Sequence, residues 1–235
     1  MISSARIFRQ LSVLAGRIGL VAAVVMIAIG LFGGGARAIP NQDLPLVESA
    51  IYEDGTLLIS WNGPVVVGMS AYLRSVFEKH ASESRRIVLH LDSIGGDVEE
   101  GERAIAVLQE LKATHWLVTL VMHGDICASM CVPIYLQGAD RVAAPASLWL
   151  IHEVAILEDD GKERMDRAET LRLFTRYYLP AGVSAQWLKS IFPVIDGMNL
   201  WLTGQDLITL KTGIITLPLT NTTPRVAAAQ TKELG

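Results

Sequence analysis

The chain has 235 residues, of which 51% are hydrophobic and 19% are charged. This composition excludes an intrinsically disordered chain, and two cysteines are too few for a miniprotein held together by disulfides. The 20 basic and 24 acidic side chains give a formal net charge of −4. Because no basic stripe runs along the sequence, we expect no nucleic-acid partner.

The first 38 residues have the composition of an export signal. They contain four arginines and no acidic residue, and residues 18–32 form an uncharged apolar run, shorter than the roughly 20 residues of a membrane span. Ala36 and Ala38 supply the small side chains that a signal peptidase requires for cleavage after Ala38. The alternative is an uncleaved anchor, in which residues 11–32 hold the protein in the inner membrane. Both interpretations predict a periplasmic or otherwise extracytoplasmic protein.

The rest of the chain predicts a linker over residues 39–54, one domain over residues 55–218 and a disordered tail over residues 219–235. Within the domain, strand-like runs alternate with amphipathic helices. This alternation predicts an α/β fold with a mainly parallel sheet flanked by helices. The expected strands are 56–61, 86–91, 116–122, 141–143 and 147–151, and the expected helices are 67–80, 98–111, 164–178 and 184–192, with another starting near Ser129.

Three features at the ends of these elements could carry chemistry. Gly95 and Gly96 follow a strand, and without side chains they can bring a backbone N–H against a ligand. Ser129 lies at the expected start of a helix, where N–H groups lack intrahelical partners. An attacking serine needs N–H donors for the oxyanion, which Gly96 and Met130 could supply, and a base, which His152 at a strand end could supply. Each residue alone is more often a helix cap or a structural residue.

A pair of glycines, a serine at a helix start and a histidine at a strand end, in this order along the chain, resemble the Clp protease proteolytic subunit and its wider Clp/crotonase superfamily. The resemblance is carried by residues 89–98 (LHLDSIGGDV) with Gly101, by residues 128–130 (ASM) and by residues 148–153 (LWLIHE), and more weakly by residues 200–214. It implies a Clp/crotonase-like fold with Ser129 as nucleophile and His152 as general base. It also implies an oxyanion hole formed by Gly96 and Met130.

The third member of the triad departs from the family pattern. The position that resembles the family's acid is Asn199, and Asp196 lies three residues earlier. An asparagine can orient a histidine but cannot stabilise its cation as an acid does. Three interpretations stay open: Asp196 reaches His152, Asn199 orients it, or the triad is incomplete. Relatives that use a lysine base are a poor match, because no lysine lies near these motifs.

Cys127 and Cys131 flank Ser129 symmetrically. In an exported protein they could form a disulfide that pins the nucleophile loop, and the alternative is a pair of small buried thiols. A zinc site would need further ligands at suitable spacing, and the glycines match neither a dinucleotide nor a phosphate-binding fingerprint. We therefore expect neither a metal nor a cofactor.

We expect an exported serine peptidase or related amide hydrolase that acts on peptides or unfolded proteins by acylation of Ser129. It would be independent of ATP, since an exported chain has no access to a cytoplasmic unfoldase. The resemblance also implies self-association, with the helices of residues 164–192 as the contact surface. Two alternatives are a Clp-like binding or scaffolding protein whose triad has decayed, and acyl-CoA chemistry of the crotonase type, which does not need the pair of Ser129 and His152.

Overall fold

The computed structural model describes residues 44–157 and 161–219. The expected signal peptide or anchor, and residues 220–235 of the expected tail, lie outside the described residues. Within the described ranges, no helix combines the length and the apolar character that crossing a membrane would require.

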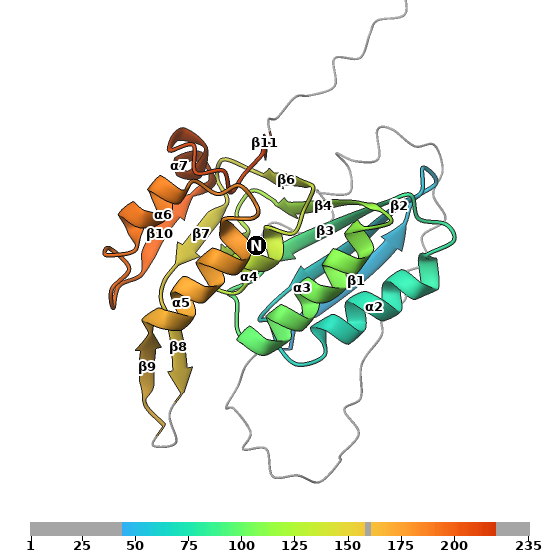
Figure 1. Ribbon diagram of the computed structural model, residues 1–235. Helices are drawn as coiled ribbons and strands as arrows, with labels where there is room; N and C mark the ends of the chain where they lie inside the picture. Colours follow the sequence, from blue (N-terminus) through green and yellow to red (C-terminus); the bar gives the residue numbers. More distant parts are fainter. Residues whose placement is uncertain (1–43, 158–160, 220–235) are drawn as a thin grey trace, which may run out of the picture.

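A six-stranded sheet in the order β1-β2-β3-β4-β6-β11 forms the larger layer (Figure 1). All neighbouring strands are parallel except the edge pair β1 and β2, so the expected mainly parallel sheet is confirmed. The sequence of β3 explains its place in the sheet, because Ile87, Leu89 and Leu91 alternate onto one face and are fully buried. The strands are β1 (Leu46–Ile51), β2 (Thr56–Asn62), β3 (Arg86–Asp92), β4 (Trp116–Val121), β6 (Asp140–Ala143) and β11 (Leu217–Pro218).

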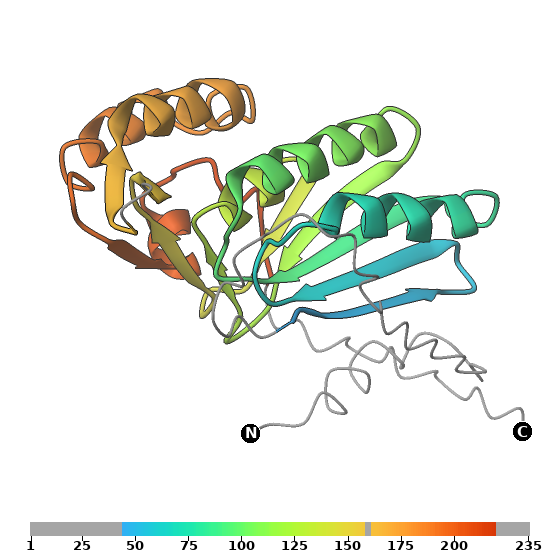
Figure 2. The same cartoon turned by 90° about the horizontal axis from the view of Figure 1, so that it is seen from below.

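Helices α2 (Met69–His80) and α3 (Val98–Lys112) lie side by side on one face of this sheet (Figure 2). Helix α2 buries Met69 and Leu73 against it, as expected from the spacing of its apolar residues. Helix α3 begins where the Asp97 side chain accepts a hydrogen bond from the Glu100 N–H at 2.6 Å. The main core therefore lies between the sheet and these two helices.

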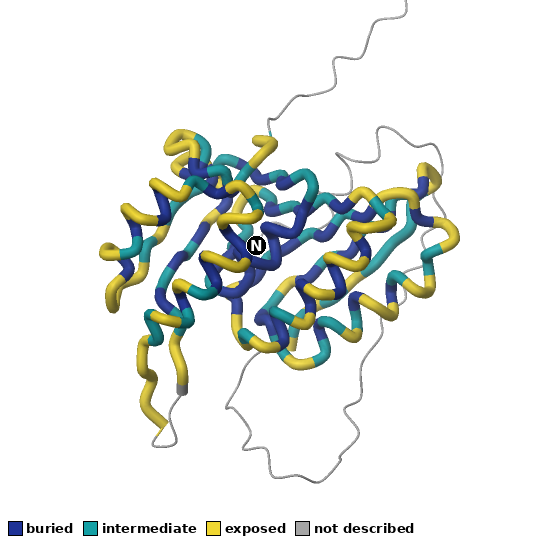
Figure 3. Tube along the Cα trace, in the orientation of Figure 1, coloured by how far each residue is buried: buried dark blue, intermediate teal, exposed yellow. Residues whose placement is uncertain are grey.

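A smaller layer contains most of the elements after β4, apart from β6 and β11. Its three-stranded sheet has the order β10-β7-β5, and an antiparallel hairpin of β8 and β9 extends away from the body of the molecule. Figure 3 shows that most of this hairpin is exposed, whereas the region around α4 is buried. The elements are β5 (Ile126–Ala128), α4 (Cys131–Tyr135), β7 (Leu148–Ile151), β8 (Val154–Leu157), β9 (Glu163–Asp166), α5 (Arg167–Leu173), the π-helix η2 (Phe174–Tyr178), α6 (Ala185–Ile191), β10 (Leu200–Thr203) and α7 (Gly204–Thr209).

The structure differs from the expected elements in three places. Residues 46–51 lie in the expected linker but form β1, because all of them pair with residues of β2. Residues 163–166 lie in the expected helix 164–178 but form β9, and the helix starts only where Asp166 caps it by accepting the Glu169 N–H. The helix after Ser129 begins at Cys131 and has five residues.

Candidate active site

Three strand ends bring the candidate residues together. Strands β5 and β7 are parallel, so Ser129 and His152, which follow them, emerge at the same edge of the small sheet. The end of β3 joins this edge, because the Ser93 N–H donates to Ile126 O at 2.7 Å and the Ala128 N–H donates to Ser93 O at 2.9 Å. The loop containing Gly95 and Gly96 therefore lies beside the turn that carries Ser129.

A cavity of about 260 Å³ opens at this meeting point. Ser129, His152, Gly96 and Met130 all contribute to its lining. The structure thus brings the expected nucleophile, base and oxyanion-hole residues to one place. The other lining residues are mainly apolar: Ile94, Val98, Pro133, Ile151, Val154, Ala155, Thr170, Leu173, Phe174 and Tyr178.

The two glycines are required by the path of the loop. Val65 holds the loop through two backbone hydrogen bonds. Its N–H donates to Gly95 O at 2.8 Å, and its carbonyl accepts the Asp97 N–H at 2.9 Å. Gly96 has a φ of 147°, and a Cβ there would lie 2.3 Å from Val65 O. The two hydrogen bonds to Val65 involve Gly95 O and the Asp97 N–H. The Gly96 N–H between them has no backbone acceptor in the described part of the chain.

Ser129 occupies a backbone conformation that side chains rarely adopt, with a φ of 53°. Its N–H donates to Leu150 O, and its carbonyl accepts the Val132 N–H, each at 3.0 Å. A Cβ on Gly95 would lie 2.6 Å from Ser129 Cβ and 2.9 Å from Met130 N. The bare Gly95 therefore leaves open the space in front of the Met130 N–H, which has no backbone acceptor among residues 44–157 and 161–219.

Gly101 on α3 explains why the resemblance extends to that position. A Cβ there would lie 2.3 Å from Met130 Cγ and 2.5 Å from Met130 Cε. The missing side chain of Gly101 makes room for the buried Met130 side chain. This packing holds in place a residue that lines the cavity.

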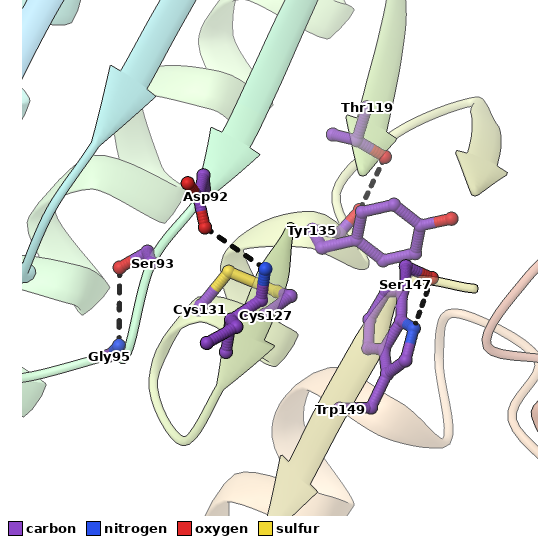
Figure 4. Close-up of a disulfide and its surroundings, with 10 residues drawn as sticks. Asp92, Ser93, Gly95, Thr119, Cys127, Cys131, Tyr135, Ser147 and Trp149 are labelled. Carbon is purple, nitrogen blue, oxygen red and sulfur yellow. Dashed lines mark hydrogen bonds between the residues drawn. A yellow bond between two sulfur atoms is a disulfide. The ribbon is translucent and has the colours of Figure 1, made fainter. Parts of the chain in front are cut away.

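A disulfide joins Cys127 to Cys131 across the nucleophile turn (Figure 4). The two Cα atoms are 5.3 Å apart, and both side chains are fully buried. Beside the bridge, Asp92 Oδ1 accepts the Ile126 N–H at 3.0 Å, and burial raises the pKa of the Asp92 carboxyl. The turn that carries Ser129 is thus closed covalently, and Asp92 ties the start of β5 to the large sheet.

His152 is oriented by the main chain. Its Nδ1 lies 2.5 Å from the carbonyl oxygen of Glu153. A carbonyl oxygen can only accept, so Nδ1 carries the proton and Nε2 is the free basic nitrogen. In the described residues no hydrogen bond joins Ser129 Oγ to His152, and catalytic contacts of this kind often close only when substrate binds.

The two candidates for the third member lie in different surroundings. The Asp196 side chain is 72% exposed, and its carboxylate lies 3.6 Å from Arg167 Nη1. Asn199 precedes β10, whose antiparallel register pairs Leu200 with Ile151, so Asn199 and His152 each lie one residue beyond this pair. Within the described part of the chain, neither candidate makes a hydrogen bond to the imidazole.

Sequence reasoning missed Glu153. Its side chain is only 3% exposed, and its carboxylate accepts hydrogen bonds from Arg167 Nη1 at 2.8 Å and from the Gly197 N–H at 3.2 Å. A charged residue after a strand end normally indicates a surface position, so only its place next to His152 could have drawn attention to it. Nowhere in the described ranges do three or more His, Cys, Asp or Glu side chains form a group that could hold a metal ion.

Residues 68–166 match the family model described as Clp protease. Over this segment the chain is similar to the Clp protease family. The matched part includes Gly96, Ser129 and His152, and it ends before the loop that carries Asp196 and Asn199. The match supports a peptidase-type function and agrees with the resemblance that the sequence motifs indicate.

Similar solved structures establish the fold. ClpP1 from Listeria monocytogenes is 20% identical, with a TM-score of 0.53 over 70% of this chain and 91% of that chain. A mutant of the same protein is 20% identical, with a TM-score of 0.51 over 72% of this chain and 92% of that chain. No curated protein matches the chain. The protein therefore has the α/β fold of the ClpP structures, as its sequence predicts.

Proposed function

We propose that the protein is an ATP-independent serine peptidase that acts outside the cytoplasm on peptides or unfolded proteins. The observation that carries this proposal is the position of Ser129, on a strained and covalently closed turn that shares one cavity with His152. Gly96 and Met130 line the same cavity, and their N–H groups have no backbone acceptor among the described residues. A nucleophile, a base and an oxyanion hole are the parts that acyl transfer requires.

In the proposed reaction, Ser129 Oγ attacks the scissile carbonyl carbon while its proton passes to His152 Nε2. The carbonyl oxygen becomes an oxyanion that accepts hydrogen bonds from the Gly96 and Met130 N–H groups. His152 then donates the proton to the leaving amine, which departs and leaves an acyl ester on Ser129. Water, activated by the same imidazole, hydrolyses this ester. The apolar wall, which includes Ile151 and Phe174, would hold an apolar substrate side chain.

Two observations support a location outside the cytoplasm. The first 38 residues contain four arginines, no acidic residue and an apolar run. The disulfide between Cys127 and Cys131 is of a kind that persists in oxidising compartments. In such a compartment the protein has no ATP-driven unfoldase, which limits its substrates to chains that are already short or unfolded.

The alternative is a binding protein on a peptidase fold. It is favoured by one observation, an asparagine at position 199, one residue beyond the pair of Leu200 and Ile151, because an amide cannot stabilise the imidazolium that forms during attack. Such a protein would hold peptides in the cavity without turning them over.

Labelling of the purified protein with a fluorophosphonate separates these two functions. We expect one label per chain, located on Ser129 by mass spectrometry, and no label on Ser129→Ala. Ser75→Ala is the matched control, because Ser75 lies on α2 and its hydroxyl bonds only to Tyr72 O. An unlabelled wild-type protein with a native circular dichroism spectrum would refute the peptidase and leave the binding protein.

A further inference from the structure

Glu153 has an unusual environment for a carboxylate. It is almost completely buried, directly follows His152, and is neutralised by Arg167 at 2.8 Å. Its other oxygen accepts the Gly197 N–H at 3.2 Å. Burying a charge is unfavourable unless it is paired and fully hydrogen-bonded, and here both partners come from outside the strand that carries His152.

Arg167 contacts Phe192 and Asp196 as well as Glu153. Its guanidinium carbon lies 4.0 Å from the centre of the Phe192 ring, and its Nη2 donates to Phe192 O at 3.3 Å. The same group reaches the Asp196 carboxylate at 3.6 Å. A planar guanidinium with several fixed donors can hold these positions at once, which a lysine cannot do. The main chain beyond His152 is therefore anchored through the Glu153 side chain.

This anchoring determines what His152 can do. The main-chain carbonyl of Glu153 accepts the His152 Nδ1–H at 2.5 Å, so its position sets the tautomer and the direction of the ring. In a serine hydrolase triad, these two tasks belong to the acid. Asn199, at the family position of that acid, makes no hydrogen bond to His152 within the described residues.

We infer that Arg167 and Glu153 are positioning residues that hold the Glu153 carbonyl against His152 Nδ1, and so perform the orienting task of the missing acid. This inference rests on the proposed function, in which His152 is the base. A neutral carbonyl stabilises the imidazolium less than a carboxylate does. The arrangement therefore supplies orientation and tautomer but only part of the charge stabilisation.

The competing explanation is that the ion pair only stabilises the fold. A pair of variants of the full-length protein separates the two. Arg167→Met leaves Glu153 buried and unpaired, so it weakens the fold under either explanation. The double variant Glu153→Gln/Arg167→Met has no unpaired buried charge, so we expect its thermal midpoint to recover most of the loss. Arg74→Met removes an exposed arginine, paired with Glu110 at 2.8 Å, and serves as the control.

The decisive readout is the tautomer of His152, measured by nitrogen-15 imidazole NMR and assigned with His152→Gln. We expect the Nδ1–H tautomer in the wild type and in Arg74→Met, and a mixture of tautomers in the double variant. The rate of fluorophosphonate labelling and kcat for a p-nitrophenyl ester should fall about tenfold to a hundredfold in the double variant with KM unchanged, within the contribution of a general base.

A wild-type tautomer and wild-type rates in the folded double variant would overturn the inference, because the ion pair would then be structural only. A wild type that shows the Nδ1–H tautomer but takes no fluorophosphonate label would refute the proposed function instead. The NMR comparison would still decide whether Arg167 and Glu153 position the imidazole.

Discussion

Asn199 and His152 each lie one step beyond the paired residues Leu200 and Ile151 of strands β10 and β7. Asn199→Asp would place a carboxylate at this position and could stabilise the imidazolium. We expect acylation by a fluorophosphonate to become at least tenfold faster. Stopped-time labelling followed by intact mass measures the rate. The control is Asp196→Asn, because Asp196 is exposed and turned to Arg167. A larger increase of the labelling rate in Asp196→Asn would contradict the assignment of position 199 to the third member of the triad.

The disulfide should stabilise both the fold and the nucleophile turn. It closes a loop between residues four positions apart, and closing so short a loop contributes about 2 kcal/mol in the chain-entropy model. The double variant Cys127→Ala/Cys131→Ala should lose about that much free energy of unfolding in urea and should be labelled more slowly at Ser129. Labelling at the wild-type rate would show that the hydrogen bonds of the turn suffice to hold it.

Gly95 should be irreplaceable because any side chain there would collide with Ser129, and not only because of its backbone conformation. Gly95 and Gly124 have φ values of 82° and 86°, but a Cβ would meet Ser129 at Gly95 and nothing within 4 Å at Gly124. Gly124→Ala should therefore cost only about 1–2 kcal/mol of stability and keep the labelling rate. Gly95→Ala should abolish labelling. Equal losses in both variants would mean that backbone strain is the whole effect.

The stability of the protein should fall at acid pH partly through Glu100. Burial raises the pKa of this carboxyl, but hydrogen bonds from Ser70 and Arg103 outweigh that effect and leave the pKa below its usual value. The folded state therefore binds the proton less readily than the unfolded chain. The stabilisation is present above the unfolded pKa and is lost as pH falls through the folded pKa.

Urea unfolding at a series of pH values tests this. Glu100→Gln should be less stable than the wild type at neutral pH by about 1–3 kcal/mol, and the difference should shrink below about pH 4. Glu110→Gln, which changes a carboxylate that is 59% exposed, is the control and should follow the wild-type curve. A constant difference at all pH values would exclude Glu100 as a source of the acid sensitivity.

Self-association through residues 164–192, which form the end of β9 and the helices that follow it, should depend on their exposed apolar side chains. Leu171 on α5 is 52% exposed, and Leu179 and Met165 near it in sequence are each 41% exposed. Leu171→Asp should lower the mass measured by light scattering by dissociating the assembly. Leu210→Asp changes a side chain of 53% exposure that follows α7, and it should leave the mass unchanged. A monomeric wild type would contradict the expectation.

Strands β2, β3, β4 and β6 of the central sheet and its two helices could be predicted from the sequence because their patterns are local. Alternation in residues 86–92 and the three- and four-residue spacing in residues 69–80 are each visible within one segment. The same holds for Gly96, Ser129 and His152, whose spacing along the chain matches that of a known family.

The remaining features depend on contacts between distant segments. Strand β5 has three residues and acquires its identity from pairing with β7. Strand β9 has the charged sequence ERMD, which carries no strand signal until β8 lies beside it. The burial of Glu153 requires Arg167 from another element. The choice between Asp196 and Asn199 likewise depends on the register of β10, which the sequence does not display.

The chain contains only two cysteines, and both are in the bridge that encloses Ser129. A single pair can be joined in only one way within a chain, so oxidative folding of this protein has no incorrect disulfide isomer to resolve. The protein thus needs an oxidant for its thiols but no disulfide isomerase. Whether the disulfide around Ser129 forms is accordingly set by the redox potential of the compartment in which the protein folds.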